Sequence, residues 1–135
     1  MDVRFAFLCD AAERGPGGKI SALGIGIGNF LVPDLSKPVA PFVFVCSIAG
    51  TSPEAGTKKM AIHVIDADGN DVAPVVRGEI GIGRPPAGNR WETSIVMQFR
   101  DVKFRSYGAH SISLVVDGHE MVNIPFTVSP LPPSG

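Results

Sequence analysis

The chain is short of charge, of cysteine and of long apolar runs, and each shortage excludes a class of protein. Charged side chains make up 19% of the 135 residues, below the ~25% of an average domain, and the formal net charge is −1. A chain whose positive and negative charges nearly cancel lacks the electrostatic attraction that drives most nonspecific binding to nucleic acids and to anionic membranes. We therefore expect neither nucleic acid nor a membrane as a partner.

Only two cysteines are present, Cys9 and Cys46, and each lies inside an apolar run. A thiol in such a run behaves as a small hydrophobic side chain, so we expect both cysteines to be buried and reduced. The apolar run at 5–9 is shorter than the ~7–15 residues of a secretory signal core. The longest charge-free stretches, 20–32 and 38–53, fall short of the ~18–20 apolar residues that span a bilayer. We therefore predict a cytoplasmic protein.

Glycine and proline are plentiful, with 16 and 12 residues, so long helices are not expected. Apolar side chains alternate in short runs that end at Gly, Pro, Asn or Asp, as in β-strands. The pattern predicts eight strands: Val3–Asp10, Lys19–Gly28, Phe42–Ala49, Lys58–Asp66, Val75–Ile82, Trp91–Arg100, His110–Asp117 and His119–Val128. Such a chain is typical of an all-β fold, an immunoglobulin-like or jelly-roll β-sandwich. We expect one domain over residues 1–129, followed by a loose proline-rich tail at 130–135.

The closing hairpin is the most specific local prediction. Asp117-Gly118 separates two apolar runs by two residues and suits a type I′ turn. Such a turn predicts a register that pairs Val116 with His119, Leu114 with Met121 and Ile112 with Asn123. Pro125 cannot donate a hydrogen bond to a sheet, so the last strand should lie toward an edge.

Two stretches place glycine at every second position. In an extended strand at 19–28, Leu23, Ile25 and Ile27 would share one face and bare backbone would form the other, and the pattern recurs at 79–83. Glycine weakens a strand, so a neighbouring surface should approach the bare face closely. That neighbour is either an aromatic ring of the same chain or a second chain lying along the strip. The candidate interface residues are Gly24, Gly26, Gly28, Gly81 and Gly83.

Motif spacing gives no support for a cofactor or a metal ion. The glycines at 24, 26 and 28 lack the GxGxxG spacing and the following helix that a dinucleotide site requires. The acidic turn at 66–71 lacks the position-six glycine and position-twelve glutamate of an EF-hand loop. His110 and His119 should lie at opposite ends of the closing hairpin, about 20 Å apart, too far for one zinc ion. We therefore expect no cofactor and no metal.

Catalytic motifs are missing as well. The sequence has no GxSxG elbow, and Cys9 lies in an apolar run rather than in the electropositive setting that activates a thiol. The carboxylates Asp34, Glu54 and Asp101 fall between predicted strands, where solvation is their ordinary state. A hydrolase or isomerase would need one of them beside a histidine in a single cleft. We therefore predict that the protein is not an enzyme.

Four segments carry a family resemblance: FAFLCDAA at 5–12, GKISALGI at 18–25, SLVVDG at 113–118 and IPFTV at 124–128. Together they span most of the chain and resemble a bacterial family of short cytosolic proteins known mainly as a domain of unknown function. That family offers no catalytic residues to transfer. The closing hairpin is also similar to that of immunoglobulin-like and fibronectin type III sandwiches, in which a tyrosine before the penultimate strand ties a corner. Here Tyr107 is followed at once by glycine, which departs from the usual spacing.

We therefore expect a non-catalytic module that binds a protein partner or associates with itself through its glycine strips. Two alternatives stay open. One is a small-ligand binder whose pocket between the sheets would be lined by Phe30, Phe42, Phe44 and Trp91. The other is a subunit of a larger structural assembly.

Overall fold

A computed structural model describes residues 1–51, 56–82 and 90–131. In these ranges the chain forms ten strands, a single 3-10 turn at Pro16–Gly18 and no α-helix. The strands are β1 (Asp2–Cys9), β2 (Ala11–Arg14), β3 (Ile20–Leu23), β4 (Asn29–Leu31), β5 (Phe42–Thr51), β6 (Gly56–Asp66), β7 (Val76–Ile82), β8 (Arg90–Phe99), β9 (Gly108–Val116) and β10 (His119–Ser129). The all-β prediction is confirmed, and in the described ranges no helix is long and apolar enough to cross a membrane.

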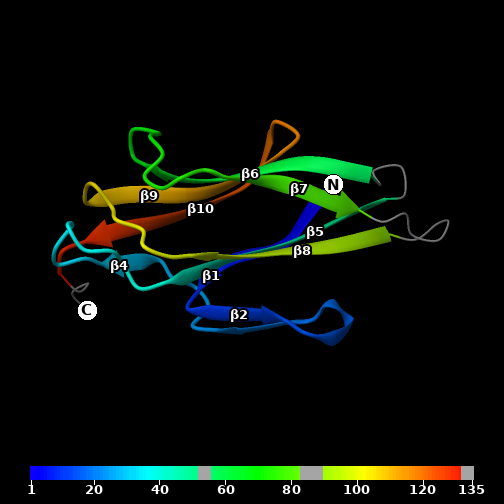
Figure 1. Cartoon of the computed structure of the whole chain (residues 1–135), viewed down its shortest axis with the longest axis horizontal. Coiled ribbons are helices and arrows are strands. Elements are labelled where there is room, and N and C mark those ends of the chain that lie inside the picture. Colours follow the sequence, from blue (N-terminus) through cyan, green and yellow to red (C-terminus); the bar gives the residue numbers. More distant parts are fainter. Residues whose placement is uncertain (52–55, 83–89, 132–135) are drawn as a thin grey trace.

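The strands form two sheets that pack face to face in a sandwich-like arrangement, with a small hairpin outside (Figure 1). One sheet has the order β1-β5-β8 and the other the order β4-β10-β9-β6-β7. All neighbouring strands run antiparallel except β4, which pairs parallel to the end of β10. The core between the sheets is aliphatic and aromatic, with Phe44 and Ile48 from the smaller sheet and Ile62 and Leu114 from the larger one.

The β2–β3 hairpin covers the outer face of the three-stranded sheet, and this explains the long apolar run of β5. In Figure 1 the hairpin forms a third layer beside β1, β5 and β8. Val43 and Val45 of β5 pack with Cys9 into a second core cluster beneath it. Every residue of β5 from Phe42 to Gly50 is buried, because one face meets the other sheet and much of the opposite face meets the hairpin.

Most predicted strands are present within one to two residues of the predicted ends, but two short strands were not predicted. β2 has four residues and β4 has three, which is too short for an alternating pattern to be recognised. The apolar alternation of these strands is reflected in their burial, since Ile62 and Val64 of β6 and Trp91 and Phe99 of β8 are all buried. The predicted tail falls largely at 132–135, outside the described residues.

The closing hairpin has the predicted turn but not the full predicted register. Asp117 and Gly118 have φ of 48° and 82°, as a type I′ turn requires, and Val116 pairs with His119. A bulge between Glu120 and Val122 then shifts the pairing by one residue, so the predicted pairs beyond it are wrong. The observed partners are Val122 for Leu114, Ile124 for Ile112 and Phe126 for His110. The bulge places apolar side chains on the core face, where the unshifted register would have placed Asn123 and Thr127.

Pro125 and Tyr107, two residues singled out by the sequence, have identifiable roles near the end of the chain. Pro125 lies where β10 pairs with β9 alone, because pairing with β4 begins at Thr127. The Tyr107 hydroxyl donates a hydrogen bond to the carbonyl oxygen of Val32 at 2.8 Å. This bond ties the entry of β9 to the segment that follows β4, despite the glycine that follows the tyrosine.

Candidate functional site

The first glycine strip is not an extended strand, and this part of the prediction is wrong. β3 ends at Leu23, and Gly24 and Gly26 have φ of 68° and 96°, which glycine adopts without strain. The chain turns here so that the amides of Gly26 and Ile27 both donate to the carbonyl oxygen of Leu8, at 2.8 and 3.2 Å. Ile27 consequently packs toward the core, whereas Ile25 points to solvent.

The bare sides of the predicted glycines have different surroundings. Gly24 has a φ of 68° and its bare side faces the exposed Asp10 carboxylate, so a larger residue here would be strained and would have to displace the Asp10 side chain. Within the described ranges, a Cβ placed on Gly26, Gly28 or Gly81 would have no atom within 4 Å apart from its chain neighbours, so no aromatic ring of these ranges lies against that side. Gly83 lies outside the described residues. The expectation of an aromatic cover is therefore wrong at the three open positions.

We define the glycine-rich surface as residues 23–31 with the facing segment 38–42. The two segments border a groove of about 620 Å³, with Phe30 and Phe42 among its lining residues. Leu23 precedes the groove and is 73% exposed, and Ile25 and Leu31 on its border are 60% and 48% exposed. Asp10 is the sole charged residue that lines the groove in the described ranges. The surface therefore combines exposed aliphatic side chains with accessible polar backbone and carries little charge.

The predicted ligand pocket between the sheets is not formed as expected. Phe30 and Phe42 pack edge to face with ring centroids 5.0 Å apart and border the groove. Phe44 and Trp91 are 0% and 5% exposed and line no part of that groove. The four aromatic side chains therefore belong to the packed core, and the structure does not gather them around one cavity.

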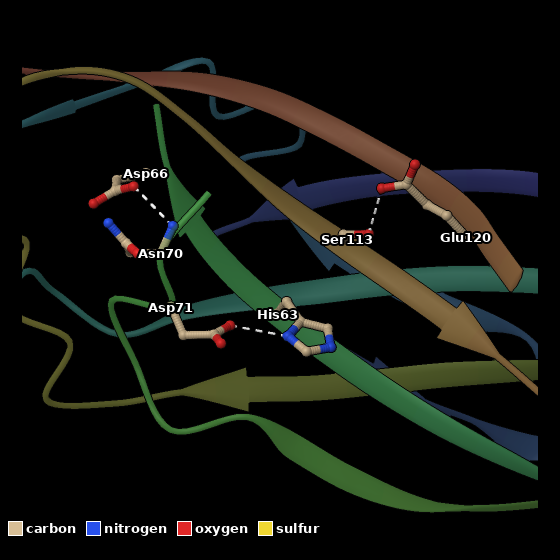
Figure 2. Close-up of polar contacts among 6 residues, drawn as sticks. All are labelled: His63, Asp66, Asn70, Asp71, Ser113 and Glu120. Atoms are coloured by element: carbon tan, nitrogen blue, oxygen red, sulfur yellow. Dashed lines mark hydrogen bonds and ion pairs between the residues drawn. The ribbon is translucent and has the colours of Figure 1, made fainter. Parts of the chain in front are cut away.

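Two separate polar contacts lie on the outer face of the five-stranded sheet. Figure 2 shows His63 on β6 turned toward Asp71, with Nδ1 of the histidine 2.9 Å from Oδ1 of the carboxylate. Ser113 on β9 is the cross-strand partner of His63, but its hydroxyl donates to Oε1 of Glu120 at 2.6 Å. The serine proton is thus directed to Glu120 rather than to the histidine. This arrangement joins β9 to β10 beside the bulge.

Removing Glu120 should therefore weaken the sheet. Ser113 is 4% exposed, so a Glu120→Ala variant leaves a buried hydroxyl without its acceptor. We expect the free energy of unfolding to fall by about 1–2 kcal/mol in urea titrations. Glu79→Ala, at an exposed glutamate of β7, is the matched control and should cost less than ~0.5 kcal/mol. Equal losses in the two variants would contradict a structural role for the Ser113–Glu120 hydrogen bond.

The other polar candidates are dispersed through the described part of the chain. Asp66 accepts hydrogen bonds from the backbone amides of Asp68 and Asn70 and so closes the 66–70 turn. Figure 2 shows the bond to Asn70. Hydrogen bonds from the hydroxyl and then the amide of Ser36 lower the pKa of Asp34. Glu54 lies outside the described residues. No group of three metal-ligating side chains is found among the described residues.

The two cysteines lie on opposite faces of the three-stranded sheet. Cys46 faces the core between the sheets, and Cys9 faces the β2–β3 hairpin. Both are buried and free, as predicted, and their placement precludes a disulfide within the chain. Burial raises the pKa of the Cys46 thiol to about 11, and burial followed by the charge of Asp10 raises the pKa of Cys9.

A comparison with family models gives one match, to a family of unknown function (DUF6941) over residues 4–129. The chain belongs to this family. The DUF6941 match runs from β1 through the end of β10, so the family spans both sheets and the outer hairpin. This confirms that the four short segments of the sequence belong to a domain of unknown function.

Other comparisons add little to the DUF6941 match. No curated protein matches the chain. One similar solved structure is Pseudomonas fluorescens alkylpurine DNA glycosylase AlkC bound to DNA containing an abasic site analog, with 14% identity and a TM-score of 0.41. The similarity covers 92% of this chain and 30% of that one. A likeness at this level supports no conclusion about activity.

Proposed function

We propose that this domain is a non-catalytic binding module whose contact site is the glycine-rich surface. The observation that carries the proposal is the exposure of Leu23, Ile25 and Leu31, at 73%, 60% and 48%, within one short segment. Large aliphatic side chains clustered beside a groove are a common mark of surfaces that are covered on association. Open backbone at Gly26 and Gly28 lets a partner chain approach without a steric barrier.

The occupant that best fits this surface is a second copy of the chain. Residues 20–32 and 38–42 contain no charged side chain, so Asp10 is the one like charge that each of two copies would bring to the described groove. A two-fold contact uses the same patch on both subunits, and an apolar patch is complementary to itself. The net charge of −1 also leaves little long-range repulsion between copies.

Sedimentation velocity over a wide concentration range tests this function. Changing Leu23 to Gln and Ile25 to Thr together is expected to weaken self-association about tenfold or more, because both anchors become polar. Val115→Thr is the control, since it makes the same kind of change on the outer face of β9, away from the groove. A wild-type chain that stays monomeric throughout would contradict self-association. In that case the double variant should be compared in capture of a different protein partner.

We also infer that the sandwich is of the immunoglobulin-like type and that the protein works in the cytoplasm. The bond from the Tyr107 hydroxyl to Val32 supports the first inference, because it ties a corner before the penultimate strand. The buried free thiols of Cys9 and Cys46 support the second, because unpaired cysteines are typical of a reducing compartment.

A further inference from the structure

A second hollow lies beneath the tip of the β2–β3 hairpin, on the outer face of the three-stranded sheet. Its volume is about 630 Å³, within the range of small-molecule sites, which is ~300–1,000 Å³. Arg14, Lys19 and the Gly17-Gly18 pair line it from the hairpin, and Ser47 lines it from β5. It shares no lining residue with the groove of the glycine-rich surface. We call this hollow the hairpin cleft.

The hairpin cleft holds an excess of positive charge in a chain that is almost neutral. Its charged lining residues are Arg4, Arg14, Lys19 and Glu92, three cations against one carboxylate. Arg4 and Glu92 pair with each other across β5 at 2.9 Å, so they offset each other. The Arg14 guanidinium donates to the backbone carbonyl of Ser94, which holds it over the sheet without neutralising it. Lys19 has no ion-pair partner among the described residues, which leaves two uncompensated cations.

The floor of the hairpin cleft contributes a hydroxyl donor. Ser47 is 2% exposed, and within the described ranges its side chain makes no hydrogen bond. The hydroxyl oxygen is not among the fully enclosed unpaired atoms of the described residues, so it is accessible from the hollow, and an oxygen atom of a ligand could accept its hydrogen bond. At the mouth, a Cβ placed on Gly17 or Gly18 would have no atom of a non-neighbouring described residue within 4 Å, so no side chain of the described ranges narrows the entrance there.

We propose that the hairpin cleft binds a small molecule through its phosphate group. Arg14 and Lys19 supply charged donors from the hairpin side, and the Ser47 hydroxyl supplies a third donor from the sheet. Donors from different directions suit a tetrahedral oxyanion, and the guanidinium keeps further N–H groups beyond the one used on Ser94. The half-exposed ring of Phe5 at the border offers an apolar contact for the body of the ligand.

Titration of the labelled protein with sodium pyrophosphate at constant ionic strength, followed by amide NMR shifts, tests the proposal. We expect saturable shifts at Gly17, Gly18 and Ser47, with little change in the groove of the glycine-rich surface. Lys19→Gln and Arg14→Gln should each weaken binding about tenfold or more, as expected for lost charge-assisted hydrogen bonds. Glu92→Gln should strengthen binding, because it removes the sole carboxylate lining the cleft in the described ranges.

Lys37→Gln is the matched control, because it removes the same charge from an exposed residue outside the cleft. Identical titrations of the Lys19 and Lys37 variants would overturn the proposal, as would equal shifts with sodium chloride alone. A sugar phosphate and a phosphoserine peptide, titrated in parallel, separate the two sources of a phosphate group. Tighter binding of the peptide would overturn the assignment to a small molecule. Self-association is measured separately, so the two proposals can fail independently.

Discussion

Replacing Phe104 by alanine is expected to lower the free energy of unfolding by about 3–5 kcal/mol. Phe104 lies between β8 and β9 and is 1% exposed. Its ring centroid lies 5.4 Å from that of Phe30, 5.7 Å from that of Phe126 and 5.1 Å from that of His110. The side chain thus packs against β4, β9 and β10, and its loss would leave a cavity that these strands cannot easily close.

His110 increases the expected cost of this change. It is 4% exposed, its Nδ1 lies 3.0 Å from the carbonyl oxygen of Gly108, and its Nε2 has no partner in the described part of the chain. The ring is therefore held mainly by Phe104 on one side and Phe126 on the other. A cavity beside it would loosen the one buried imidazole of the described core.

Urea titrations of three variants test the role of Phe104. Phe104→Leu should cost less than ~2 kcal/mol, because it keeps much of the buried volume, and it remains measurable if the alanine variant does not fold. Phe5→Ala is the control, because Phe5 is 38% exposed and stacks on Phe7 at the surface. We expect it to cost about 1 kcal/mol or less. Similar losses for Phe104→Ala and Phe5→Ala would contradict the packing described for Phe104.

The sequence predicts those strands that have one apolar face and one polar face. Ile62 and Val64 alternate with polar or small side chains on β6, and only one register places both in the core. The Asp117-Gly118 turn is predictable for a local reason, since two successive positive φ angles favour these residue types. Such features depend on neighbours along the chain and so can be inferred before any tertiary contact is known.

The features that were missed depend on contacts between distant segments. The bulge after Glu120 is favoured because it turns Ile124 and Phe126 toward the other sheet, and the turn sequence contains no sign of it. Gly24 adopts a left-handed conformation beside Asp10, which the alternation at 19–28 conceals. Phe104 lies between strands, where no periodicity marks it as a core residue.

The same limit applies to the two candidate sites. Gly26 and Gly28 were identified from their spacing, but the groove beside them forms only because 38–42 lies opposite. The hairpin cleft joins Arg14 and Lys19 to Ser47, which is distant in sequence and lies within an apolar run. In the sequence, Ser47 is indistinguishable from an ordinary strand residue. Its role depends on β2 and β3, which cover the neighbouring outward-facing valines of β5 and leave Ser47 beside the hairpin tip.

Both thiols are expected to resist modification in the folded chain and to react fully once it unfolds. Cys46 is 0% exposed, and burial raises the pKa of its thiol from 9.0 to about 11. The thiolate is the reactive species, and at pH 8 about one Cys46 thiol in a thousand would be ionised, against about one in ten at the ordinary value. Ionisation of Cys46 is harder in the folded chain than in the unfolded chain, so it affects the free energy of unfolding. Stability is unaffected while the pH stays below the ordinary pKa of 9.0, and it declines as the pH rises from there toward 11.

Reaction with a disulfide reagent at pH 8 measures this protection. We expect negligible reaction in buffer and two equivalents in urea, and the Cys9→Ala and Cys46→Ala variants assign the rate of each thiol. Rapid reaction of either thiol in the folded chain would contradict the burial described here. If labelling requires global unfolding, its rate follows the population of the unfolded chain. The Phe104→Ala change should then accelerate labelling of Cys46 by roughly 10²–10⁴-fold, whereas Phe5→Ala should accelerate it by about fivefold at most.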